Sequence, residues 1–130
     1  MIAAWYQLDG WGHNMPDLAD ISGFSPQEQA ALGYHRQNLL GGTGLKHKDG
    51  STTTFYGTVI DTDKGSTIIP TYWGGAIRSV PDAMRWAIKS GIEFPTYPTT
   101  KDALAAEQRM HSVMEQDVNA FSKGVPSATR

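Results

Sequence analysis

Two runs of strand-forming residues separated by a turn signal constrain this chain most strongly. β-Branched and aromatic residues alternate over residues 52–60, and a second, shorter run covers 67–69. Such residues favour strands because their side chains pack well on a pleated surface. The segments 48–50 and 61–65 have the aspartate, lysine and glycine composition of turns. The pattern predicts a short antiparallel meander over about residues 43–73.

A capping signal marks the first predicted helix. Ser25 can accept a hydrogen bond from the first turn, Pro26 suits the first helical position, and Glu28 lies where a capping box requires it. A glycine such as Gly33 is typical of a helix end. We therefore expect a short helix that begins at Pro26 and ends near Gly33.

Two further helices are expected in the second half of the chain. Ser79 is the predicted cap of a helix that ends at Gly91, and Thr99 or Thr100 is the cap of a longer helix over residues 101–121. The longer helix has an apolar stripe of Ala103, Ala106, Met110, Val113, Met114, Val118 and Phe121. A small sheet needs a helix packed on one face to be stable. The predicted fold class is therefore α+β, a small antiparallel β-meander packed with two or three helices.

The ends of the chain differ from this predicted core. Residues 1–24 combine aromatic residues with glycines that interrupt any period, so we expect an extended, irregular arm. Residues 25–121 are predicted to form a single α+β domain, which suits a chain of 130 residues. Within it, the proline-punctuated stretch 92–100 is expected to be an extended linker. Residues 122–130 are expected to form a flexible tail.

Composition argues against several classes of function. The net charge is −2, so the chain lacks the overall basic character of a nucleic-acid-binding or membrane-surface protein. The absence of cysteine excludes disulfides, thiolate nucleophiles and cysteine metal sites. No stretch approaches the roughly 18 apolar residues of a membrane span. We expect no membrane partner and no nucleic-acid partner.

No motif for catalysis or ligand binding is complete. The glycines at 42 and 44 begin a dinucleotide-binding pattern, but His47 replaces the third glycine. The segment 61–65 begins like a calcium loop without the later ligands, which favours a hairpin turn. His111 and Glu115 are four residues apart on one helix face, where one pair is too few for a metal and a surface interaction is expected. We therefore expect no catalytic residue, no cofactor and no metal.

The middle and end of the chain resemble a module of tailed-bacteriophage virion proteins. That module has a D-G-S turn, a strand, a charged turn ending in glycine, an I-P-T sequence, a short helix ending in G-x-x-F, an aromatic-Pro-Thr linker and an alanine-rich helix closing with histidine. The matching positions are Asp49-Gly50-Ser51, Gly65, Ile69-Pro70-Thr71, Ala83, Gly91, Phe94, Thr99, Ala103 and His111. The resemblance does not cover residues 1–37. It implies a structural, internal or ejected virion protein without catalytic residues.

The predicted function is accordingly that of a non-enzymatic bacteriophage virion structural protein. It would dock to neighbouring subunits of the head, the head–tail connector or the tail, with other virion proteins as partners and homo-oligomers in a symmetric assembly. Its location would be the virion, and the host cytoplasm during assembly. Aromatic residues dominate interface energies. The interface candidates are Trp5, Tyr6, Trp11, Phe24, Trp73, Tyr97 and Phe121.

Two alternatives remain open at this stage. A cell-wall-acting virion or lysis enzyme would need a carboxylate such as Glu93, or a histidine such as His111, at an aromatic cleft beside Trp73. A phage-encoded inhibitor that binds a host protein would need only a docking surface. The environment of Trp73 bears on each possibility: a buried Trp73 belongs to the core, and an exposed one contacts a partner or ligand.

Overall fold

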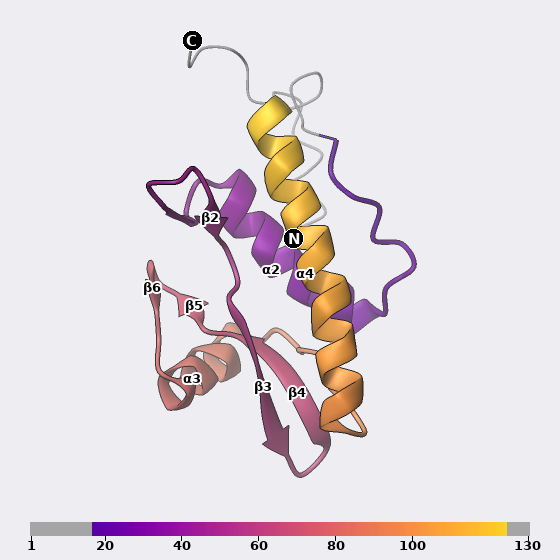
Figure 1. Cartoon of the computed structure of the whole chain (residues 1–130). Helices are drawn as coiled ribbons and strands as arrows, with labels where there is room; N and C mark the ends of the chain where they lie inside the picture. Colours follow the sequence, from indigo (N-terminus) through magenta and orange to yellow (C-terminus); the bar gives the residue numbers. More distant parts are fainter. Residues whose placement is uncertain (1–16, 125–130) are drawn as a thin grey trace.

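The computed structural model describes residues 17–124, which form three helices and seven short antiparallel strands (Figure 1). This confirms the predicted α+β class. The helices are α2 (Pro26–Leu40), α3 (Val80–Ser90) and α4 (Thr100–Gly124). The strands are β1 (Leu45–Lys46), β2 (Thr52–Thr53), β3 (Gly57–Thr62), β4 (Gly65–Pro70), β5 (Tyr72–Trp73), β6 (Ala76–Ile77) and β7 (Thr96–Tyr97). The described residues before α2 contain no helix or strand.

The strands form one three-stranded sheet and two small hairpins. The sheet has the order β3-β4-β7, and β1-β2 and β5-β6 each pair by themselves. The predicted turn at Asp63 and Lys64 connects β3 to β4, and Val59 pairs with Ile68. Strand β7 pairs with the beginning of β4, where Ser66 lies opposite Tyr97. The stretch 92–100 was expected to be only a linker, but it contributes the third strand of the sheet.

The alternating run 52–60 forms two strands instead of one. The break between them contains Tyr56, whose φ of 52° is uncommon for a residue other than glycine. The Thr71 N–H and hydroxyl both donate to the Tyr56 carbonyl, which holds this conformation in place. As a result the Phe55 ring is buried in the core and the Tyr56 ring is exposed.

Helix α2 begins as predicted but is much longer. The Ser25 Oγ accepts from the Glu28 N–H at 3.1 Å, and Glu28 Oε1 accepts from the Ser25 N–H at 2.9 Å, which completes the capping box. The predicted end near Gly33 is wrong, because the helix continues to Leu40. A glycine inside a helix costs about 1 kcal/mol relative to alanine. Burial of this part of the helix, including Leu32, offsets that cost.

The boundaries of the other two helices follow their capping residues. The Ser79 Oγ accepts from the Asp82 N–H, and α3 stops at Gly91, which has a left-handed φ of 73°. The Thr99 hydroxyl accepts from the Asp102 N–H at 3.1 Å and caps α4. Helix α4 ends at Gly124, so residues 122–124 are helical and do not belong to a tail as expected.

The hydrophobic core lies where α3 and α4 pack against the sheet and α2 packs against α4 (Figure 1). Ile68 on the central strand, Leu32 on α2 and Met110 on α4 are each fully buried. Trp73 packs against the Tyr34 ring at a centroid distance of 4.4 Å and against the Phe94 ring at 6.1 Å. This aromatic contact joins α2 to the hairpin β5-β6 and to the segment after α3.

Gly65 provides a test of the sheet. It has a φ of 132°, and a Cβ atom there would lie 2.3 Å from the Tyr97 carbonyl oxygen on β7. Gly50 also has a positive φ, of 92°, but has open space around its Cα. We predict that Gly50→Ala lowers the free energy of unfolding by about 1–2 kcal/mol. Gly65→Ala should lower it further because β7 must move away. Urea denaturation of both variants measures the difference, and equal losses would contradict the described packing of β7.

Candidate functional site

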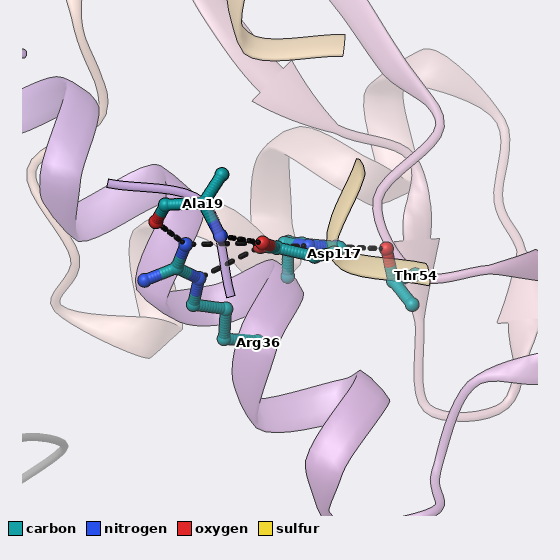
Figure 2. A network of polar contacts seen from close by, with 5 residues as sticks. Ala19, Arg36, Thr54 and Asp117 are labelled. Carbon is teal, nitrogen blue, oxygen red and sulfur yellow. Dashed lines mark hydrogen bonds and ion pairs between the residues drawn. The ribbon is translucent and has the colours of Figure 1, made fainter. Parts of the chain in front are cut away.

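A buried polar network joins α2, α4 and the segment before α2 (Figure 2). Its centre is the carboxylate of Asp117, which is 0% exposed. Oδ2 accepts from Arg36 Nε at 2.7 Å and from His35 Nε2 at 3.0 Å. Oδ1 accepts from Arg36 Nη2 at 3.1 Å and from the Ala19 N–H at 2.8 Å. Together with Thr54, which contacts His35, these residues are called the Asp117 network below.

The Asp117 network attaches the irregular segment before α2 to the domain. The Ala19 N–H donates to Asp117, and the Ala19 carbonyl accepts from Arg36 Nη2 (Figure 2). Both backbone polar groups of one residue are therefore bound by a single ion pair. Ile21 and Phe24 are half-buried and pack against the core. The described end of the predicted arm thus has a fixed position on α2 and α4.

Burial and hydrogen bonding determine the charges in the network. Burial raises the pKa of Asp117, but hydrogen bonds from His35, Arg36 and the Ala19 N–H outweigh it and lower the pKa below its ordinary value. Burial lowers the pKa of His35 and outweighs the attraction of Asp117. A neutral His35 that donates from Nε2 to Asp117 can accept from the Thr54 hydroxyl at Nδ1. Arg36 is then the cation that balances the carboxylate.

Thr54, His35 and Asp117 follow the order hydroxyl, imidazole and carboxylate that is found in hydrolase triads. In a hydrolase the hydroxyl and the imidazole meet the substrate. Here His35 is 0% exposed and Thr54 is 4% exposed. Thr54 is also held through its backbone, since Asn38 Nδ2 donates to its carbonyl at 2.9 Å. In this structure the three groups therefore connect the segment after β2 to α2 and α4, and the His35 imidazole is closed to a substrate.

A polar groove lies between α4 and residues 47–57. Its volume is about 630 Å³. It is lined by His47, Asp49, Gly50, Ser51, Thr52, Thr53, Thr54, Phe55, Tyr56, Gly57, Glu107, His111, Met114, Glu115, Val118, Asn119 and Ser122. His111 Nε2 lies 3.5 Å from Glu115 Oε2 on the exposed side of α4, as expected for a surface pair. Within residues 17–124 no three His, Cys, Asp or Glu side chains are grouped to hold a metal ion.

A second, aromatic groove of about 870 Å³ lies beside the hairpin β5-β6. Tyr34, Tyr72, Trp73 and Trp86 contribute its aromatic side chains. The hydroxyl groups of Tyr34 and Tyr72 donate to backbone carbonyls, and Trp73 Nε1 donates to the Pro70 carbonyl at 2.7 Å. The polar atoms of these three side chains therefore already form hydrogen bonds within the fold.

The predicted interface residues have different environments. Trp73 is 4% exposed and belongs to the core, so it does not face a partner. Phe24, Tyr97 and Phe121 are half-buried, and the Tyr97 hydroxyl donates to Glu28 Oε2. The other three candidates, Trp5, Tyr6 and Trp11, lie outside the described residues.

The residues that an enzyme was expected to use do not come together. Glu93 is exposed and lines neither groove. His111 lines the polar groove, whereas Trp73 lines the aromatic one. The carboxylate and histidine named for cell-wall hydrolysis are therefore not arranged around the Trp73 side chain.

The Asp117 network was missed in the sequence, although two signals for it were present. Asp117 follows Val113 by four residues and Met110 by seven, so it occupies a position in the apolar stripe of α4. An acid at such a position is rarely buried without a partner. Arg36 is the single base in the first 40 residues. Together these signals would have indicated a buried ion pair.

Comparisons with known proteins identify no relative. The chain matches no family model, no curated protein and no solved structure. Among the described helices, none is both long enough and apolar enough to cross a membrane. Function is therefore inferred from the residues and their geometry.

Asp117→Asn tests the importance of the network. The substitution removes the charge that pairs with Arg36, and breaking a buried ion pair in this way costs about 3–5 kcal/mol. Glu115→Gln is a matched control, because it makes the same chemical change at an exposed pair on the same helix and should cost less than about 1 kcal/mol. The free energies of unfolding can be measured by urea denaturation. Similar losses in the two variants would contradict a central role for Asp117.

His35 gives the network a pH dependence. Its pKa is lowered from the ordinary 6.5, so the unfolded chain binds a proton at pH values where the folded chain does not. The contribution of neutral His35 to the free energy of unfolding is complete at pH values above the pKa of His35 in the unfolded chain. It is lost as the pH falls below that pKa. We expect the urea midpoint to decrease from about pH 7 to about pH 5. In His35→Gln most of this decrease should be absent, and an equal decrease in both proteins would contradict the assignment.

Proposed function

We propose that the protein is a non-enzymatic structural component of a tailed-bacteriophage virion, which docks to neighbouring subunits of the head, the head–tail connector or the tail. The observation that carries the docking role is the attachment of Ala19 to Asp117 and Arg36 through both of its backbone groups. Trp5 and Trp11 precede this point in the sequence and are therefore tethered to a fixed position on the domain.

The resemblance of residues 49–111 to a virion module supports the choice of a virion. In the structure this region provides the strands β2 to β7, helix α3 and the first half of α4. Its residues Ile68, Ala83 and Ala103 belong to the same hydrophobic core. The resembling segment is thus the central packing unit of the domain, to which α2 and the segment before it are added.

The chemistry of the arm suits docking. A buried aromatic side chain covers about 150–250 Å². At about 25 cal/mol per Å² of apolar area, each would contribute at most about 4–6 kcal/mol before the cost of ordering the chain is subtracted. Symmetric assemblies hold many copies, so modest single contacts add together. Trp5, Tyr6 and Trp11 together would provide a sufficient anchor for each copy.

A cell-wall-acting enzyme is the second candidate, because Thr54 lines the polar groove and contacts His35, which in turn contacts Asp117. Hydrolysis would require a movement that exposes His35. A zymogram on peptidoglycan distinguishes the two functions. Clearing by the wild-type protein that is lost in Thr54→Val would favour the enzyme, and no clearing by either protein would favour the structural role.

Deletion of residues 1–12 tests the docking role of the arm. We predict that the shortened protein is absent from purified phage particles, because it lacks all three aromatic anchors, Trp5, Tyr6 and Trp11. Its helical circular dichroism should be retained, because Ala19 and the Asp117 network are intact. Mass spectrometry of particles measures incorporation, with the full-length protein as the reference. Normal incorporation of the shortened protein would contradict an anchoring role for the arm.

A further inference from the structure

Helix α3 has an exposed row of large apolar side chains. Val80, Met84 and Ile88 are spaced four residues apart and therefore lie along one side of the helix. They are 40%, 37% and 79% exposed. The side of α3 that packs on the domain buries only Ala83 and Ala87. Exposed apolar rows of this kind mark interaction surfaces.

Positive charge borders this row. Arg85 and Lys89 are exposed on α3, next to Met84 and Ile88 in the sequence and around the helix. Arg85 has one weak partner within the described residues, Asp82 at 3.6 Å. An occupant that combines large apolar side chains with negative charge would suit this surface.

We propose that the row Val80, Met84 and Ile88 is the docking surface for residues 1–11 of a neighbouring copy of this chain. The inference rests on the proposed arm-docking function and names the acceptor of the arm. Residues 1–11 supply Trp5, Tyr6 and Trp11, an acid at Asp9, and no lysine or arginine. The apolar content complements the row, and the Asp9 carboxylate can pair with Arg85 or Lys89.

The position of the arm's attachment favours a neighbouring copy over the same chain. Figure 1 shows the described chain beginning beside the C-terminal half of α4, on the far side of the domain from α3. The six residues from Trp11 to Asp17 span at most about 22 Å. A domain of this size is about 34 Å across. Trp11 of an arm therefore falls short of α3 on its own chain, so the three aromatic residues of one arm cannot all reach that surface together. Docking between copies is head-to-tail and builds rings or filaments.

Sedimentation velocity of the full-length chain tests the surface. We expect concentration-dependent self-association that the double variant Met84→Asp, Ile88→Asp weakens by about tenfold or more. Leu104→Asp is the matched control: Leu104 is 51% exposed on α4, and the same change there should leave self-association unchanged. Equal self-association of the α3 variant and the wild type would overturn the proposal.

Mixing two defective chains tests the occupant. Trp5→Ala, Trp11→Ala has an intact α3 row, and Met84→Asp, Ile88→Asp has an intact arm. At a concentration at which the wild type self-associates, each variant alone should be largely monomeric. An equimolar mixture should form a heterodimer and nothing larger, because one arm and one row remain functional. A mixture that stays monomeric would overturn docking between copies. Self-association of the tryptophan variant alone would show that α3 pairs with something other than the arm, and would equally overturn the proposal.

Failure of the arm–α3 contact can be distinguished from failure of the proposed virion function. A full-length chain that is monomeric at every concentration overturns the role of α3 as acceptor. If the same protein is found in purified particles, docking to other virion proteins stands. If the chain self-associates through α3 but is absent from particles, the virion role fails while the arm–α3 contact stands.

Discussion

The carboxylate of Asp117 is the interaction on which the rest of the structure depends. A buried charge is costly unless it is paired and hydrogen-bonded. Here Arg36, His35 and the Ala19 backbone supply four hydrogen bonds to the two oxygens. Helix α2, helix α4 and the segment before α2 must therefore come together for all of these hydrogen bonds to form. An apolar contact could join the two helices, but it could not bind the Ala19 backbone.

The same helix that carries Asp117 also covers the sheet. Its N-terminal half packs Ala103, Ala106 and Met110 into the core, and Asp117 follows one turn after Val113 on the same side. This arrangement gives the molecule two sides with different roles. The described chain begins on one side, and helix α3, which carries the exposed row, lies on the other (Figure 1). A contact in which the arm of one copy binds the α3 row of the next copy would repeat from subunit to subunit.

Local signals in the sequence predicted the parts of the fold that local chemistry determines. The caps at Ser25, Ser79 and Thr99, the stop at Gly91 and the turn before Gly65 are examples.

The errors in the sequence-based predictions depend on contacts distant in sequence. Helix α2 passes through Gly33 because its neighbours are buried, β7 exists because β4 pairs with it, and Tyr56 keeps its positive φ because Thr71 binds its carbonyl. Trp73 was expected at an interface because composition alone does not distinguish a core aromatic residue from an exposed one. Asp117 was missed because its partners are 81 to 98 residues away.

Amide hydrogen exchange at Ala19 tests the central claim most directly, because its N–H is held by Asp117 and by no helix or strand. If the network fixes this segment to the domain, the Ala19 amide should exchange as slowly as amides in the middle of α4, through global unfolding. In Arg36→Gln the Ala19 amide should lose its protection and exchange faster than global unfolding allows. Amides in the middle of α4 should still exchange only through global unfolding of that variant. Exchange of the wild-type Ala19 amide at the rate of an unstructured peptide would contradict the claim that the Asp117 network anchors the arm.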